Sequence, residues 1–212
     1  MPPALIELHY LPCVQYCTKL LRHPQLVLED AENYQKGSYR NRCWIAATNG
    51  PLRLSIPLDR GKNEGQAIRE VRINYRQDWQ AQHWRSIQSA YGKSPFFEHY
   101  ADELAPLYQS PVEYLFDWNL LLLQTLLQLL DLPSALAYSG QYYREVPPDW
   151  SDLRNTIQER PGRQVPDPHF SPRPYPQVFL EKRGFLPNLS ILDLLFCTGP
   201  QATIYLEQCI DA

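Results

Sequence analysis

The spacing of apolar and polar residues divides the start of the chain into three short elements. Residues 4–8 form an apolar run that predicts a buried strand, and residues 26–28 predict a second strand. Residues 12–23, between them, have helical spacing, and Pro12 suits the first turn of a helix. A strand, a helix and a strand in this order favour a parallel βαβ unit.

Two further apolar runs indicate a hairpin. Residues 43–47 and 52–57 enclose an Asn-Gly pair at positions 49 and 50, and this dipeptide favours a tight turn between antiparallel strands. Apolar residues at 68, 71 and 73 predict one more strand. Sheet-forming segments are therefore expected mainly in the first third of the chain.

The middle of the chain predicts three helices, at residues 78–91, 97–108 and 112–130. Asp78 can cap the first of them. A pair of helices is expected at the C-terminus, where Ser190 and Asp193 have capping-box spacing. Gly199 can close the first helix of this pair, and Pro200 can open the second.

The predicted fold is α/β, of the mixed α+β kind. It has a central mixed sheet with an N-terminal βαβ unit and a β-hairpin, a helical middle segment and a C-terminal helical pair. We expect one domain over residues 1–212. Residues 147–176 contain eight prolines, with Trp150, Phe170 and Tyr175 as anchors, and predict an arm or lid within that domain.

Composition narrows the class of protein. The chain has 212 residues, of which 44% are hydrophobic, and this is enough for a sizeable core. The net charge of −3 argues against nucleic-acid binding. The leucine-rich run at residues 120–130 is too short and too polar for a membrane span, and the N-terminus does not have the pattern of a signal peptide. We therefore expect a cytoplasmic protein.

Cysteine usage agrees with a reducing compartment. The five cysteines are odd in number and irregularly spaced, which is typical of reduced thiols. Cys13 and Cys17 would share one face of a helix, but a zinc site needs more ligands at recognisable spacing. We expect packing residues there and no metal site, and the sequence identifies no cofactor.

The segment at residues 36–47 contains the first candidate chemistry. Strand alternation from position 40 would place Arg40 and Arg42 on one face, with Lys36 nearby, and Asn41 on the other face. Paired guanidinium groups suit phosphate or carboxylate, because each offers a planar fork of donors. The alternative is a solvated strand face, or salt bridges to Glu29, Asp30 and Glu32.

His83 is the second candidate. It lies in an aromatic and apolar stripe of the predicted helix at 78–91, where a histidine is commonly a hydrogen-bonded core residue. If a cleft opened over this stripe, His83 would be a general acid or base. Asp78, Lys93 and Glu98 flank the same region.

Two further segments allow both a chemical and a structural interpretation. Cys43 could act as a nucleophile with His9 or His83, or it could be a buried strand cysteine. Asn188 and Ser190 could help a helix N-terminus to bind an anion, or they could cap that helix. Glycine-rich phosphate loops, GxSxG elbows and HExxH helices are absent from the sequence, which argues against the enzyme classes that they mark.

Four segments resemble the WbqC-like family of bacterial proteins: YLPCVQYCTKL, ENYQKGSYRNRCWIAATNGPLRLSIPL, DWQAQHWRSIQSAYGKSPFFEHYADEL and GFLPNLSILDLLFCTGPQA. The RNRC, HWRSIQSAYGKSPFF and PNLSILDLLF portions are most similar to the Bacteroidetes branch. Many members begin with His-Gln-Pro-x-Tyr-x-Pro. Tyr10 and Pro12 match this motif, whereas Ile6 occupies the histidine position and His9 lies three residues later.

The resemblance implies a role in surface-polysaccharide or sugar-nucleotide biosynthesis, such as acyl or aminoacyl transfer to an amino sugar. The first hypothesis is therefore a group transferase acting on a nucleotide-linked or phosphorylated small molecule. His83 would move a proton, with Asp78 or Glu98 orienting it. The expected substrate-binding residues are Tyr10, Lys36, Arg40, Asn41, Arg42, Lys93 and Asn188, in one shared pocket.

Two other functions stay open at this point. A non-catalytic scaffold could bind a partner through the proline-rich residues 147–176. Nucleic-acid binding would rest on dispersed arginines, among them Arg53, Arg69, Arg72 and Arg76, against the acidic total. A homo-oligomer is compatible with all three functions.

Overall fold

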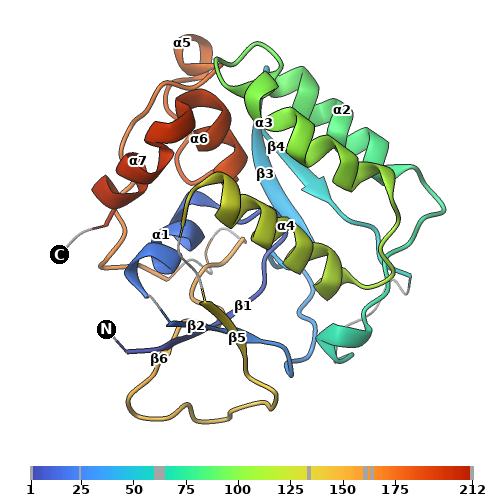
Figure 1. Ribbon diagram of the computed structural model, residues 1–212, viewed down its shortest axis with the longest axis vertical. Coiled ribbons are helices and arrows are strands. Elements are labelled where there is room, and N and C mark those ends of the chain that lie inside the picture. Colours follow the sequence, from blue (N-terminus) through green and yellow to red (C-terminus); the bar gives the residue numbers. More distant parts are fainter. Residues whose placement is uncertain are drawn as a thin grey trace.

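Four short parallel strands form the central sheet of the computed structural model, which describes residues 2–23, 25–59, 65–132, 135–159, 162 and 165–210. The strands are β1 (Ala4–Glu7), β2 (Gln25–Glu29), β5 (Ala135–Tyr138) and β6 (Ser151–Asp152), in the order β5-β2-β1-β6. Helix α1 (Val14–Arg22) connects β1 to β2, which confirms the predicted βαβ unit. Figure 1 shows α1 and α4 above this sheet and the segment from β5 to β6 below it.

Burial on both faces explains why β1 and β2 are almost continuously apolar. All four residues of β1 are buried, as are the last four of β2. Parallel strands that are covered on both sides have no exposed face, so their sequences do not alternate. Glu7 and Glu29 end these strands and are themselves buried, so their carboxylates need partners inside the protein.

The predicted hairpin is confirmed as a separate two-stranded sheet. Strands β3 (Arg42–Ala47) and β4 (Gly50–Ser55) are antiparallel, with Cys43 opposite Leu54. Gly50 has a φ of 108°, which a residue with a side chain rarely adopts, so the turn depends on this glycine. The expected mixed sheet is thus divided into a parallel sheet and a hairpin.

The strand predicted at residues 68–73 is wrong. Ile68–Glu70 is a 3-10 helix, η1, and only isolated bridges follow, such as Leu58 with Ile73. The reason lies in the spacing, because Ile68 and Val71 are both buried and are three residues apart. A turn with three residues per revolution places them on one face, whereas strand alternation would place them on opposite faces.

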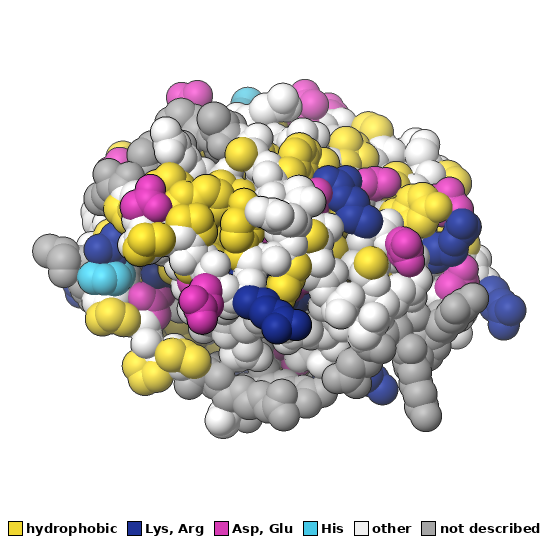
Figure 2. Space-filling view, turned by 90° about the horizontal axis from the view of Figure 1, so that it is seen from below, with side chains coloured by type: hydrophobic (Ala, Val, Ile, Leu, Met, Phe, Trp, Pro, Cys, Tyr) yellow, Lys and Arg dark blue, Asp and Glu magenta, His cyan; other side chains and the backbone are white. Residues whose placement is uncertain are grey.

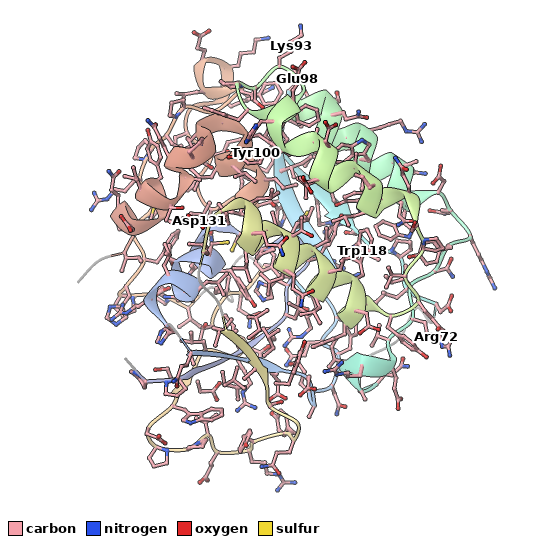
Figure 3. The ribbon with its side chains drawn as sticks, viewed as in Figure 1. Arg72, Lys93, Glu98, Tyr100, Trp118 and Asp131 are labelled. Carbon is pink, nitrogen blue, oxygen red and sulfur yellow. The ribbon has the colours of Figure 1, made fainter. Side chains whose placement is uncertain are left out.

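The helical middle is confirmed, with shorter boundaries than expected. It contains α2 (Trp79–Tyr91), α3 (Phe97–Leu104), the 3-10 helix η2 (Ala105–Gln109) and α4 (Leu115–Leu129). The α-helical part of the second element ends before Pro106, which has no N–H to continue the ladder. Trp118 of α4 is fully buried at the centre of this group and makes edge-on contacts with Trp79 and Tyr108 (Figure 3).

The C-terminal helical pair is also confirmed. Helix α5 (Leu180–Arg183) precedes α6 (Ile191–Thr198), η3 (Gly199–Gln201) and α7 (Ala202–Gln208). Ser190 caps α6 by accepting a bond from the Leu192 N–H. Asp193 has another role, since its Oδ2 accepts bonds from the hydroxyl of Tyr175 and the amide of Gln177. In the part of the chain that the structure describes, no helix is long and apolar enough to cross a membrane.

The described residues of the proline-rich segment 147–176 lie against the rest of the protein. The short strand β6 joins the central sheet beside β1. Ile157 and Tyr175 are buried, and Asp167 forms an ion pair with Lys19 of α1. This segment therefore contributes structure to both ends of the sheet.

Gly199 provides a test of the packing between α6 and α3. A Cβ at this position would overlap the ring of Phe96, and φ is 57°. We expect Gly199→Ala to lower the free energy of unfolding by about 1–3 kcal/mol more than Gly184→Ala, because overpacking adds to backbone strain. Gly184 also ends a helix at positive φ, but its Cβ would meet open space. If urea unfolding gave the same loss of unfolding free energy for both variants, the overlap between a Cβ at position 199 and the Phe96 ring would be contradicted.

Candidate functional site

Loops that leave the carboxyl ends of the parallel strands enclose a polar pocket of about 440 Å³. Residues 31–35 follow β2, Tyr142 follows β5, and Arg154 and Asn155 follow β6. β1 connects to β2 on one side and has β6 on its other side, so connections diverge from this point of the sheet. Ligands of open α/β sheets bind at such a switch point. We call this cavity the switch-point pocket, and its volume suits a small molecule.

A buried guanidinium organises the floor of the switch-point pocket. Arg40 is 1% exposed, and its Nε and Nη2 donate to the two carboxylate oxygens of Glu32 at 2.6 and 2.5 Å. The same Nη2 donates to Asn155 Oδ1 at 3.0 Å, and Nη1 lies 3.9 Å from Glu7 Oε1. Because Glu32 and Asn155 line the pocket, the ion network fixes two of its polar walls.

Glu7 and His9 form a second buried pair behind this floor. His9 Nε2 lies 3.0 Å from Glu7 Oε1, and Glu7 Oε2 accepts the backbone N–H of Asn155. Burial raises the pKa of Glu7, but bonds from His9 and Asn155 and the charge of Arg40 outweigh it and lower the pKa to about 2. The carboxylate therefore accepts the His9 Nε2–H and fixes the tautomer.

The other nitrogen of His9 has no partner among the described residues. Nδ1 is buried without a hydrogen bond, while the ring stacks on Tyr39 at a centroid distance of 5.3 Å and also contacts Tyr16. Burial lowers the pKa of His9 below its usual value, against the raising effect of Glu7. The ring is therefore neutral near pH 7, and Nδ1 has a free lone pair.

Acidic side chains outnumber guanidinium groups around the switch-point pocket. Glu29 Oε2 pairs with Arg154 at 2.9 Å, and Asp30 pairs with Arg69 at 2.7 Å. The charged groups of this region are Glu7, Glu29, Asp30, Glu32 and Asp152, against Arg40, Arg69 and Arg154. Of these groups only Glu32 and Arg154 line the pocket, and the Glu32 carboxylate favours a ligand that donates hydrogen bonds.

The structure brings Tyr10 and His83 together, inside the core. The hydroxyl of Tyr10 lies 2.9 Å from His83 Nδ1 and 3.0 Å from the hydroxyl of Tyr108. Burial lowers the pKa of His83 to about 4, although the backbone of Ser55 also bonds to the ring and raises it. His83 Nδ1 thus has a protein partner and the ring is buried, which is the geometry of a core histidine.

The residues that flank His83 in sequence are spread along α2. Asp78 caps the beginning of this helix, where its side chain accepts a bond from the Ala81 N–H. Lys93 follows the other end, about 20 Å away for a helix of this length. Lys93 and Glu98 are exposed and lie at the end of the molecule farthest from the parallel sheet (Figure 3). Asp78, Lys93 and Glu98 do not converge on His83.

The predicted arginine pair is separated by the start of the hairpin. Arg40 lies before β3 and pairs with Glu32, which was the alternative considered from sequence. Arg42 begins β3 and lies 3.4 Å from Glu159, which is also 3.9 Å from Arg53. Among the described residues, these two arginines share a single carboxylate, that of Glu159.

The other predicted binding residues lie near different parts of the pocket. Asn41 accepts a hydrogen bond from the hydroxyl of Tyr34 and donates one to the Ile56 carbonyl. It therefore positions Tyr34, which lines the pocket. Lys36 is exposed in the loop next to Gln35, which lines the pocket.

Asn188 lies elsewhere. It has a φ of 55°, its Oδ1 accepts the backbone N–H of Gln15, and its amide donates to the Gln15 side chain. Asn188 therefore connects the beginning of α1 to the loop before α6. The residues that the sequence predicted to share one pocket therefore lie in several separate parts of the protein.

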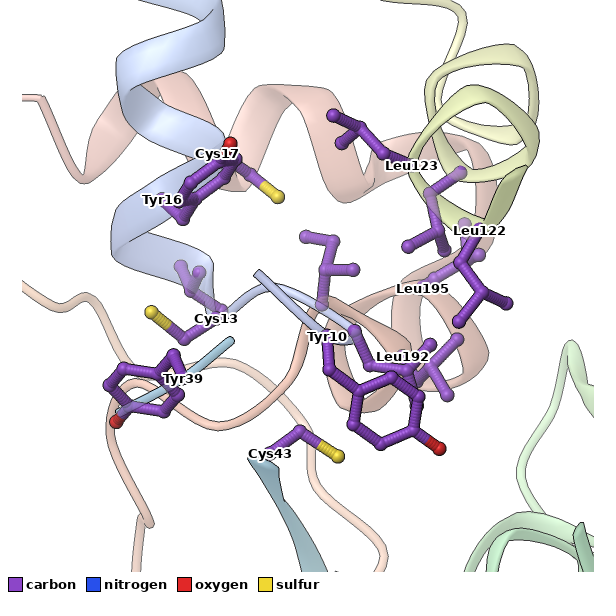
Figure 4. Packing of buried hydrophobic residues seen from close by; sticks show 14 of the residues in the cluster. Tyr10, Cys13, Tyr16, Cys17, Tyr39, Cys43, Leu122, Leu123, Leu192 and Leu195 are labelled. Carbon is purple, nitrogen blue, oxygen red and sulfur yellow. The ribbon is translucent and has the colours of Figure 1, made fainter. Parts of the chain in front are cut away.

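The cysteines have the properties of packing residues. Cys13, Cys17 and Cys43 are buried among aromatic and leucine side chains (Figure 4). Burial raises the pKa of Cys13 to about 11 and that of Cys43 well above its usual value, so neither forms a thiolate near pH 7. No group of three metal-ligating side chains occurs within the described residues.

The molecular surface near the sheet has mixed charge. On the face seen in Figure 2, basic side chains lie among acidic and hydrophobic ones, and the described side chains form no continuous basic stripe there. Nucleic-acid recognition depends on such a stripe.

Sequence reasoning missed Glu7 and Asn155 as site residues and treated Glu32 only as a salt-bridge partner. One signal was present, because Glu7 directly follows an apolar strand run. Charged residues at the carboxyl ends of parallel strands face the position where ligands bind. Nothing in the sequence indicates that Asn155 reaches the same place.

Lowering the pH tests the ionised state of Glu7. A carboxyl whose pKa falls from 4.5 to about 2 on folding stabilises the protein above pH 4.5, and that contribution disappears as the pH approaches 2. We expect Glu7→Gln to be less stable than the wild type by about 3 kcal/mol at pH 7. The difference should shrink steadily between pH 5 and 2 in urea unfolding.

Glu207→Gln, on the exposed face of α7, is the matched control and should follow the wild type throughout. A stability difference between Glu7→Gln and the wild type that does not change with pH would contradict the assignment.

Comparison with known proteins gives a family and one relative of unknown function. A model of the WbqC-like protein family matches residues 8–160, a range that includes Glu32, Arg40 and Asn155. An uncharacterised protein of Mycobacterium tuberculosis is 29% identical over 232 aligned positions, covering 97% of each chain. No solved structure matches the chain.

Proposed function

Because the chain belongs to the WbqC-like protein family, we propose that it is an enzyme that transfers an acyl or aminoacyl group to a nucleotide-linked amino sugar. The observation that carries the proposal is the switch-point pocket, in which Glu32 faces a polar cavity above the buried Arg40. Such a reaction belongs to surface-polysaccharide biosynthesis, the role that the family resemblance implies.

The lining of the switch-point pocket suits an amino sugar as the acceptor. The Glu32 carboxylate can accept a hydrogen bond from an amino group, and hydroxyl groups of a sugar can donate to the same oxygens. Tyr142 lies at the rim and is 57% exposed, and the centre of its ring is 5.0 Å from the guanidinium carbon of Arg154. Its ring can therefore cover a bound sugar. Asn155 offers an amide to the ligand's polar groups.

Glu32 is our candidate for the proton acceptor, in place of His83. Burial raises its pKa, as do the charges of Glu7 and Glu29, while Arg40 acts in the opposite direction. A carboxylate with a raised pKa in a pocket is suited to general-base catalysis. Glu7 and His9 are positioning residues in this proposal, since they hold Arg40 and Asn155 from behind.

The proposed step forms one bond and breaks one. The acceptor amine attacks the carbonyl carbon of an activated acyl or aminoacyl donor, and a C–N bond forms. The bond to the donor's leaving group breaks, and the leaving group keeps that electron pair. The proton lost by the amine nitrogen passes to Glu32.

The phosphates of the nucleotide would be held by Arg42. Among the described residues, Arg42 and Arg53 pair with one carboxylate, that of Glu159, which leaves a positive charge for an anion. Burial raises the pKa of Tyr34 and the charge of Arg42 opposes that rise, so the guanidinium is close enough to act on a pocket residue. Lys36, which is exposed next to the lining residue Gln35, remains a further candidate for phosphate binding.

Thermal-shift measurements with nucleotide-linked amino sugars test this proposal. At concentrations well above Kd, we expect the Tm of the wild type to rise by about 3–6 °C. Glu32→Gln should remove most of this shift, because the ligand's amine loses the carboxylate that accepts its hydrogen bond and, in the reaction, its proton. Tyr142→Ala should reduce it, and this exposed position has little effect on folding.

Glu207→Gln is again the control and should keep the full shift. A panel of nucleotide sugars, amino sugars, amino acids and coenzyme A that produces no shift with the wild type would contradict the proposal and favour a scaffold. A full shift with both Glu32→Gln and Tyr142→Ala would place the ligand outside the switch-point pocket.

A further inference from the structure

A second cavity, of about 340 Å³, lies toward the amino ends of the parallel strands. Pro2, which precedes β1, and His23, which precedes β2, line it together with Arg22 in the last turn of α1. Residues 165–169 of the proline-rich segment form the opposite wall. We call this space the α1-end cavity, and it shares no lining residue with the switch-point pocket.

Polar nitrogens without partners occur on both walls of the α1-end cavity. Arg22 Nη1 and His169 Nδ1 are buried and have no hydrogen bond to any described residue. Buried donors are almost always paired, because an unmade bond costs about 1–3 kcal/mol. An anion in the cavity would supply the missing acceptor for Arg22, and the His169 ring could donate to it as well.

The carboxylate in the α1-end cavity already has several partners. Asp167 forms an ion pair with Lys19, accepts a bond from the Gln15 amide at 2.9 Å, and accepts the backbone N–H of His169 at 3.1 Å. It is therefore not needed to neutralise Arg22. The cavity keeps the positive charge of Arg22, and this charge favours an anionic ligand.

Basic residues in the last turn of a helix commonly stabilise its carbonyl end, and this accounts for the presence of Lys19 and Arg22. Charge at the helix end does not account for a buried nitrogen of Arg22 that has no acceptor among the described residues. Nor does it account for a hollow bordered by His169 from a distant part of the chain.

One part of the α1-end cavity is apolar. Leu153, Val165, Pro166 and Pro168 contribute to its lining, and Val165 is 56% exposed, so the cavity opens to solvent on that side. Proline rings present a rigid apolar surface that loses little entropy when a ligand binds. A ligand with an apolar body next to its anionic group would use both parts of the cavity.

We propose that the α1-end cavity binds a small organic anion, whose phosphate or carboxylate pairs with Arg22 and whose apolar body rests on the proline-lined wall. This site is additional to the proposed transfer reaction, since no residue of the reaction lines it.

Phenyl phosphate is the probe that we would use, with benzoate as the carboxylate form and benzyl alcohol as the uncharged one. On titration into the intact protein, both anions should shift the backbone amide NMR signals of residues 19–23 and of Val165, Asp167 and His169, and benzyl alcohol should not. Arg22→Gln should weaken phenyl phosphate binding by about tenfold or more, because a charged hydrogen bond is lost. Arg85→Gln, on the exposed face of α2, should bind as the wild type does.

Each contrary result would overturn the proposal or part of it. No binding by the wild type at millimolar probe, or unchanged binding by Arg22→Gln, would remove the assigned site. Equal affinity for inorganic phosphate and phenyl phosphate would remove the role of the apolar wall. Glu32→Gln should bind phenyl phosphate normally, so this test and that of the transfer reaction can fail separately.

Discussion

The guanidinium of Arg40 connects parts of the chain that are far apart in sequence. It donates to Glu32 after β2 and to Asn155 after β6, and it lies near Glu7 at the end of β1. The backbone carbonyl of Arg40 accepts a hydrogen bond from the side-chain amide of Asn119 in α4, at 2.7 Å. Removing two charges from water costs several kcal/mol, so the pair with Glu32 stabilises the fold only while all these partners are in place. The geometry of the switch-point pocket therefore depends on one complete polar network.

Much of the fold could be predicted because local patterns determine it. Apolar runs, the Asn-Gly turn and the cap at Asp78 each specify an element without reference to distant residues. The position of β6 could not be predicted, since two residues within a proline-rich segment carry no strand pattern. They pair with β1 because the neighbouring chain is held by Asn155 and Ile157, which are tertiary contacts.

The candidate site was predicted less well than the fold, for a related reason. Alternation treated Arg40 and Arg42 as members of one strand, but β3 begins at Arg42 and the chain turns just before it. Whether a histidine can move protons depends on what occupies its second nitrogen. Tyr10 bonds to Nδ1 of His83, whereas the Nδ1 of His9 has no partner among the described residues. The sequence gives only the residue type and the spacing of His9 and His83. It does not show which atoms surround each ring, so it cannot tell which of the two has a free nitrogen.

The proline-rich segment is the physical link between the two ends of the parallel sheet. Its first part supplies Arg154 and Asn155 to the switch-point pocket, and its residues 165–169 form a wall of the α1-end cavity. Ile157, between these two parts, is buried. Asp167, in the second part, forms an ion pair with Lys19. Prolines reduce the number of conformations open to the unfolded segment, so few contacts suffice to hold it in place. The described residues of this segment are fixed at several points and line both cavities. A free arm that binds a partner would instead extend away from the protein.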